Sequence, residues 1–421
     1  MNEALTSDAV NLGADPAAIT PEKPKRIRSI DRFRGFCVFS MVIFQFLSHF
    51  PSLGFLSRLA VHDINQGIVI LPGMTLADII APAFIFAIGL TYALSFYNWL
   101  GKFGLKSAII HYVERALALV GIGAFTEISL NVVEAASGRP LNEVDITCLV
   151  FGSIAIVGII LVVVSGCTKN KLFRKISSQV LYISLSCMGI VDLVVSAIDY
   201  AYIAAGGQAV YNYWLTLQGI GVAILIALPF VRSKAWLKAL VALILTIGFS
   251  VYHQTGDNAI YLEVMPHGGI MGTLGWGAML LFDMAIADVY FERSKPMSYA
   301  LSLFFLVLGI YLVQWLGPIT MGTCSPTFIL VGTGLSGAVF ALFDVVDRFR
   351  PARFDFLAWW GKNPIILFLV EFFFVGIYTM VLPAAATTDA PLWLAIIQGV
   401  LMTALLTAFT YWLSKRKAIS V

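Results

Sequence analysis

Residues 26–50 read RIRSIDRFRGFCVFSMVIFQFLSHF, a basic stretch that runs directly into a predominantly apolar segment. The chain then passes through a loop that carries His62 and returns to an apolar segment, TLADIIAPAFIFAIGL, at residues 75–90. Basic residues anchor one end of a membrane helix, whereas a histidine and an acid at the other end are polar groups that need a reason to be there. The stretch therefore predicts a membrane helix hairpin built around a chemical site.

The composition fixes the class of protein. Of the 421 residues, 59% are hydrophobic and 12% are charged, whereas soluble proteins have roughly 25% charged residues. The net charge of +3 is small and its cations are spread over many loops, so nucleic acid is not an expected partner. The five cysteines show no paired spacing, so neither a disulfide framework nor a metal site is expected. We predict an integral, multi-pass membrane protein.

Apolar runs of about 20 residues predict membrane-spanning helices. The chain has twelve such runs, so the expected fold is an all-α, polytopic membrane helical bundle. The predicted spans are 34–50, 76–98, 108–131, 146–166, 178–203, 213–231, 235–252, 270–291, 298–317, 325–346, 362–383 and 391–413. Residues 1–25 form a polar tail without an apolar core, and residues 26–421 form the transmembrane domain.

Lysine and arginine alternate between the two sets of connecting segments. One set carries nearly all of them, and the other holds only Arg58 and Arg139. Because basic residues resist translocation, this alternation predicts that both termini are cytoplasmic. The same topology places four of the five histidines on the outer side: His49, His62, His253 and His267.

Several motifs, in order along the chain, resemble the heparan-α-glucosaminide N-acetyltransferase family and its bacterial relatives. The motifs are RIRSIDRFRG (26–35), HDINQG (62–67), TLADIIAPAFIFAIG (75–89), LTLQGIGV (215–222), GIMGTLG (269–275), SPTFIL (325–330) and GKNPIILF (361–368). The resemblance covers most of the chain, and it implies a transmembrane acyltransferase. It also implies a bacterial inner membrane as the location.

The chain departs from this family pattern at several positions. Gln45 stands where the family has Asn, Gln218 is followed by Gly rather than Arg, and Glu371 with Phe372 replaces a His-Glu pair. Residues 146–204 read as an inserted helix hairpin. We therefore expect a divergent member with its own acceptor, and an inactive relative is an alternative.

The resemblance implies that an acetyl or other short acyl group moves from cytoplasmic acyl-CoA to an amine or hydroxyl of a sugar-type acceptor on the outer side, a form of glycan modification. Histidine can act as a general base near neutral pH, and the family's histidine loop matches His62. His49, at the end of the preceding helix, is the second choice for the base. Asp78 is expected to orient the histidine, and Gln45 to take part in catalysis.

The remaining candidates line the two ends of the expected path. At the basic end, Arg28, Asp31 and Arg34 are expected to anchor the phosphates of acetyl-CoA or another acyl-CoA, because guanidinium groups bind phosphate in a bidentate manner. Polar residues on apolar helices are expected to line the substrate path together with His49: Gln218, Asn363 and Glu371. Asp283 is an acid near mid-membrane with either a tunnel-lining or a packing role. No metal is expected.

A different class of function is open on the sequence alone. A secondary transporter or a flippase of a small polar or lipid-linked substrate would use the same intramembrane charges as a permeation path. Such proteins often contain internal repeats, and the two halves of this chain show no such similarity. The lipid bilayer is an expected partner in either case, and a homodimer is a possible assembly.

Overall fold

A computed structural model describes residues 27–62, 65–135, 143–167, 170–207, 214–255, 265–349, 355–362, 367 and 382–416. The helices are α1 (Arg28–Ser48), α2 (Phe55–Leu59), α3 (Ile80–Ala135), α4 (Glu143–Cys167), α5 (Lys171–Ala204), α6 (Thr216–Ala227), α7 (Ala235–Gln254), α9 (Gly269–Glu292), α10 (Lys295–Leu316), α11 (Pro326–Phe349), α12 (Phe356–Trp360) and α15 (Leu392–Arg416). Short 3-10 turns are η1 (Pro51–Leu53), η2 (Ala77–Ile79), η3 (Leu228–Phe230), η4 (Pro266–Gly268) and η6 (Ala384–Ala386), and strands β1 (Val69–Leu71) and β2 (Met74–Thr75) form one hairpin.

The predicted all-α membrane bundle is confirmed. Among the described residues, seven helices are long and apolar enough to cross a membrane. Eleven of the twelve predicted spans coincide with helices, and most of the remaining one, 362–383, lies outside the described residues. Helix α3 accounts for two spans because the chain leaves helical geometry at Gly104, where φ is 80°. The two halves pack together, since Trp99 stacks on His111 with ring centroids 3.8 Å apart.

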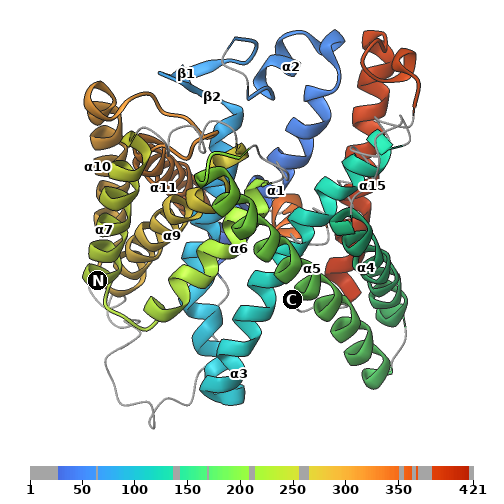
Figure 1. Cartoon of the computed structure of the whole chain (residues 1–421), viewed down its shortest axis with the longest axis horizontal. Coiled ribbons are helices and arrows are strands. Elements are labelled where there is room, and N and C mark those ends of the chain that lie inside the picture. The colour runs from blue at the N-terminus through green and yellow to red at the C-terminus, as the bar shows by residue number, and fades with distance from the viewer. Residues whose placement is uncertain are drawn as a thin grey trace.

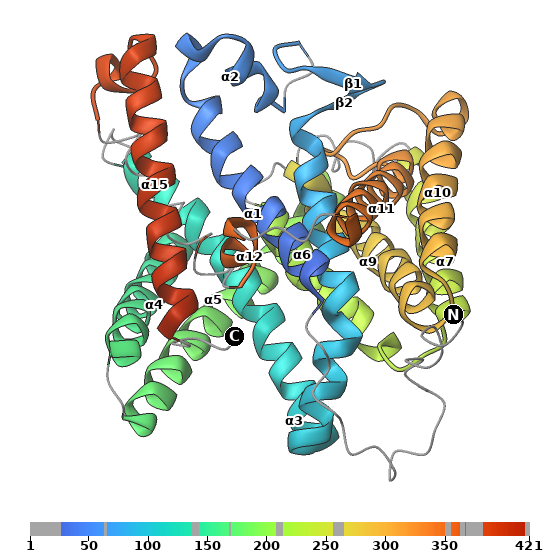
Figure 2. The same ribbon diagram turned by 180° about the vertical axis from the view of Figure 1, so that it is seen from behind.

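The helices run between two ends of the molecule (Figure 1). We call the end that carries α2 and the β1–β2 hairpin the loop face, and the opposite end, where α9 finishes and α10 begins, the basic face. Figure 2 shows that α15 stands beside α1, on the side of the bundle away from α7 and α10. The hairpin of α4 and α5 lies against α3, and Gly121 and Gly189 allow this close approach because a Cβ on either would lie within 2.2 Å of a carbonyl oxygen on the other helix.

A carboxylate joins four helices near the basic face. Asp344 of α11 accepts hydrogen bonds from Ser29 of α1 at 2.7 Å, from Tyr290 of α9 at 2.8 Å and from Tyr299 of α10 at 2.5 Å. It also pairs with Arg348 at 2.9 Å. Charge-assisted hydrogen bonds are about twice as strong as neutral ones. This node therefore fixes the first turn of α1 against the rest of the bundle.

Helix α1 crosses α12 at very short range. A Cβ on Gly35 would lie 1.7 Å from the carbonyl oxygen of Leu357, and a Cβ on Gly361 would lie 2.1 Å from that of Asp31. Both glycines belong to motifs singled out in the sequence, and their shared role here is close backbone contact. Beside them, Arg32 bonds to Asp355 at 2.8 Å and also pairs with Asp347, so this arginine is used within the protein.

We expect Gly35→Ala to destabilise the protein by about 3 kcal/mol, because the added methyl overlaps a backbone atom that cannot move alone. The measurement is the thermal unfolding midpoint of purified protein in detergent. The matched control is Gly101→Ala on helix α3. The added methyl meets no atom within 4 Å, so this substitution should be neutral or slightly stabilising. Equal midpoints for the two variants would contradict the close crossing.

Candidate functional site

The site is built on the segment that joins α1 to α3. After α1, the chain turns at Gly54, where φ is 55°, and forms α2. The N–H of Ile68 donates to the carbonyl of Arg58 at 3.1 Å, and the Arg58 guanidinium donates to the carbonyl of Gln66 at 3.2 Å. These bonds close a loop that holds His62 over the start of α3.

Asp78 is fixed by its own backbone segment. Its Oδ2 accepts from the N–H of Thr75 at 2.7 Å and from the Thr75 hydroxyl at 3.0 Å, and the residue is 3% exposed. A carboxylate at the start of a helix satisfies N–H groups that have no partner within the helix. The T-x-x-D pattern therefore closes a local turn at the start of η2, and it leaves Oδ1 free to point at the loop.

His62 completes a histidine–aspartate pair. Its Nδ1 lies 2.7 Å from Asp78 Oδ1, and its side chain is 55% exposed. Because an ionised carboxylate can only accept a hydrogen bond, Nδ1 is the donor and carries the proton. The lone pair of a neutral ring is then on Nε2, on an imidazole that is open to solvent. This arrangement is that of an oriented general base.

A second imidazole lies beside this pair. His267 of η4 is close enough to His62 and Asp78 for their charges to act on it, and its Nε2 lies 3.3 Å from the Thr216 hydroxyl of α6. Its Nδ1 is buried, and the ring also lies against the backbone of Met321. Burial lowers the pKa of His267 to about 4, so the ring is neutral at pH 7.

The backbone at His267 adopts a conformation that side chains rarely take. Its φ is +55°, and the other non-glycine residue with positive φ among those described is Cys324, at +51°. Gly272 ties the two together, since a Cβ there would lie 2.3 Å from the His267 oxygen and 3.9 Å from the Cys324 Cβ. The 318–325 loop also contacts the β-hairpin, because Ile319 N–H donates to the Pro72 carbonyl at 3.0 Å. The site is therefore built from three loops: the connection between α1 and α3, the η4 turn and the 318–325 loop.

The other predicted loop-face residues are not brought into this cluster. His49 ends α1, and its Nδ1 lies 2.7 Å from the carbonyl of Gln45, within its own helix. The Gln45 side chain is exposed. Gln218 is fully buried, and its Oε1 accepts from the N–H of Leu215 at 2.7 Å while its amide lies 3.4 Å from Asp192. It thus joins α6 to α5.

The predicted anchor residues lie in the first turns of α1, a helix of 21 residues and thus about 30 Å long, at the end opposite His62. Arg28 is exposed, whereas Asp31 and Arg34 are partly buried. Asn363 and Glu371 lie outside the described residues. The acyl donor and the histidine–aspartate pair would therefore meet only if a route crosses the bundle.

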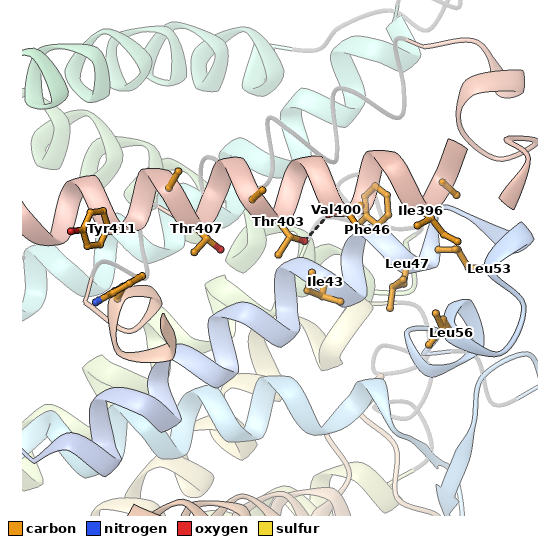
Figure 3. A pocket seen from close by; sticks show the side chains of 15 residues that line it. Ile43, Phe46, Leu47, Leu53, Leu56, Ile396, Val400, Thr403, Thr407 and Tyr411 are labelled. Carbon is orange, nitrogen blue, oxygen red and sulfur yellow. Dashed lines mark hydrogen bonds between the residues drawn. The ribbon is translucent and has the colours of Figure 1, made fainter. Parts of the chain in front are cut away.

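A groove of about 1110 Å³ runs along α15 between Tyr411 and Ile396 and reaches Leu56 of α2 (Figure 3). Trp359 lines one end of it, near the α1–α12 crossing. The lining is mainly apolar, whereas the sequence led us to expect a polar passage. The groove suits an alkyl chain better than a charged group.

The sequence predicts that His267 lies on the outer side, but it does not predict that this histidine lies beside His62. The missing signal is three-dimensional, since 205 residues separate it from His62 in the chain. The PHGG sequence at residues 266–269 marks a tight turn at the start of α9, and this turn brings His267 to the loop face near the pair.

Comparison with known proteins gives one family. Residues 26–138 match the model described as heparan-alpha-glucosaminide N-acetyltransferase, catalytic. The matched segment contains α1, His62, Asp78 and all of α3. No individual curated protein matches the chain.

The stability of the fold should depend on the protonation of His267. Because its pKa of about 4 lies below the value of about 6.5 for an unfolded histidine, the unfolded chain takes up this proton first. The contribution of neutral His267 to the free energy of unfolding is complete above pH 6.5 and is lost as the pH falls toward 4. We expect His267→Asn, which tolerates a positive φ, to flatten the fall of the thermal midpoint across this range. His49→Asn is the control, and an unchanged slope in His267→Asn would contradict the assignment.

Proposed function

We propose that this chain, whose residues 26–138 match the heparan-alpha-glucosaminide N-acetyltransferase family model, transfers an acetyl or short acyl group from acyl-CoA to an amine or hydroxyl of a sugar-type acceptor. The observation that carries the proposal is the 2.7 Å contact between His62 Nδ1 and Asp78 Oδ1. This contact lies within the segment that matches the family.

The proposed reaction uses His62 as the general base. The acceptor nitrogen or oxygen attacks the thioester carbonyl, its proton moves to His62 Nε2, the C–S bond breaks and CoA leaves as the thiol after taking up a proton. Asp78 holds the ring in the productive tautomer and stabilises the imidazolium that forms. The carboxylate is prepared for this role because Thr75 already occupies its other oxygen.

The acceptor would bind on the loop face beside His62, where its ring is accessible. The neutral His267 and the Thr216 hydroxyl add uncharged polar groups to this surface, and such groups suit a polyol better than an ionic acceptor. His49 and Gln45 lie farther along the same connection, at the end of α1. A role for them in binding the acceptor stays a prediction.

The donor would bind at the basic face, with Arg28 and Arg34 available for its phosphates and Asp31 positioning the turn. In this proposal the acyl arm crosses beside α1, and the groove between α1 and α15 is the supporting observation, because it extends from Trp359 to Leu56. Gln218, Asn363 and Glu371 keep their proposed place as polar lining of the substrate path.

We expect His62→Ala to reduce acyl transfer at least about 100-fold, because general-base catalysis contributes factors of 10² to 10⁴. The assay supplies radiolabelled acetyl-CoA and a panel of amino sugars and neutral sugars to purified protein in detergent. Asp78→Asn should also lower kcat strongly, since an amide does not enforce the same tautomer.

The variant His49→Ala distinguishes the two candidate histidines. In the structure His49 bonds to its own helix, so we expect this variant to keep transfer. Transfer lost in His49→Ala and retained in His62→Ala would move the base to His49. Each variant must keep the elution profile and thermal midpoint of the wild type. Wild-type protein that binds no acetyl-CoA and transfers nothing would overturn the proposed function.

A further inference from the structure

Buried acids in this protein generally have partners. Asp288 of α9 accepts from the Lys238 ammonium at 2.7 Å, and Asp344 accepts from several groups near the basic face. Asp78 is paired with His62, and Asp192 lies beside Gln218. Because an isolated charge in hydrocarbon costs several kcal/mol, this is the expected pattern for a membrane protein.

Asp283 breaks this pattern. It is 0% exposed, and among the described residues its carboxyl group meets no cation and no strong donor, with the Thr333 hydroxyl as its polar neighbour. It is the fifteenth residue of α9, about 21 Å along the helix from the loop face, so it lies deep in the spanning region. On its α3 side, a Cβ on Gly89 would lie 2.8 Å from the Asp283 Cβ. The carboxyl group is therefore enclosed and is not open to bulk water.

Two hydroxyl groups on α11 break a second pattern. Hydroxyls in these helices usually donate to a carbonyl one turn back, as Thr246 does to Ala242 at 2.8 Å and Ser302 does to Ser298 at 3.0 Å. Thr333 and Ser336 are both fully buried, and within the described residues neither hydroxyl donates to a carbonyl of its own helix; that of Thr333 neighbours the Asp283 carboxyl instead. Both hydroxyls therefore have free oxygen lone pairs inside the bundle.

Asp283, Thr333 and Ser336 lie where α9 packs against α11. Thr333 is the hydroxyl that neighbours the Asp283 carboxyl, and Ser336 follows it by three residues, on the same side of α11. The same side of α11 meets α3 and α9, since a Cβ on Gly332 would lie 2.9 Å from the Met279 side chain and 3.0 Å from Pro82. One carboxylate on α9 and two hydroxyls on α11 thus lie at the buried contact between these helices, and the Thr333 hydroxyl is the one that neighbours the carboxylate.

We propose that Asp283, Thr333 and Ser336 form an internal binding site for one small monovalent cation, Na⁺. The donor set consists of oxygen only, and hard cations prefer such ligands. One carboxylate balances one positive charge, so a monovalent ion leaves the site neutral, whereas a divalent ion would leave a net charge in hydrocarbon. The cation also explains why both hydroxyls are turned away from their own helix carbonyls.

The test is the thermal unfolding midpoint of the full-length protein in detergent, in NaCl and in choline chloride at equal ionic strength. We expect NaCl to raise the wild-type midpoint, because a ligand that binds only the folded state stabilises it. Asp283→Asn should lose this increment, and Thr333→Val and Ser336→Ala should each lose at least half of it. The hydroxyl variants keep the test decisive if Asp283→Asn does not fold.

The matched control is Thr246→Val, which removes a buried hydroxyl that bonds to its own helix and should keep the full increment. Equal wild-type midpoints in the two salts would overturn the proposal. A higher midpoint in Asp283→Asn than in wild type, without a sodium increment in either, would identify a protonated carboxyl instead. An increment that survives in all three site variants would also overturn it. None of these outcomes depends on the acyltransferase assay.

Discussion

The hydrogen bonds that Asp344 receives hold the first turn of α1, and the placement of the site follows from them. The carboxylate lies on α11 and takes donors from α1, α9 and α10, so four elements meet at one charge. An ion without partners at this depth would cost several kcal/mol, whereas each charge-assisted hydrogen bond offsets part of that cost. The start of α1 is fixed at Asp344, and Gly35 packs closely against α12. As a result, His49 and the loop after it lie at the opposite end of the bundle.

At that end, a single carboxylate serves both the fold and the chemistry. One oxygen of Asp78 satisfies the Thr75 backbone and hydroxyl at the start of η2, and the other orients His62. The capping bonds fix the carboxylate before any substrate arrives, so the imidazole loses little freedom on binding. Pre-organisation of this kind is what makes a general base effective. Because the cap and the orienting contact share one side chain, the T-x-x-D motif is needed for structure as well as for the proposed reaction.

The sequence was sufficient for the helices and for part of the site. Apolar runs of about 20 residues predict spanning helices because hydrocarbon forces every backbone group to bond within its own segment. His62 and Asp78 could be paired because a family motif joins them, although 16 residues and a hairpin separate them.

Long-range packing was not predictable. The ion pairs of Arg32 with Asp347 and Asp355 join residues more than 300 positions apart, and the hydrogen bond of Gln218 to Leu215 at the start of its own helix was also not foreseen. Such outcomes depend on which helices become neighbours, and one sequence does not contain that information.

The backbone strain near His267 connects the two histidines. A non-glycine residue with positive φ costs of order 1–3 kcal/mol and persists only where its surroundings determine it. Here two such residues, His267 and Cys324, both pack against Gly272, and this contact holds the backbone of His267 on the loop face. The two imidazoles then differ in environment, since one is exposed and bonded to a carboxylate while the other is enclosed and neutral. Paired titratable groups in unlike environments are how active sites separate the group that moves a proton from the group that only donates or accepts a hydrogen bond. On this argument the strained turn belongs to the proposed site, in which His62 is the residue assigned to move the proton.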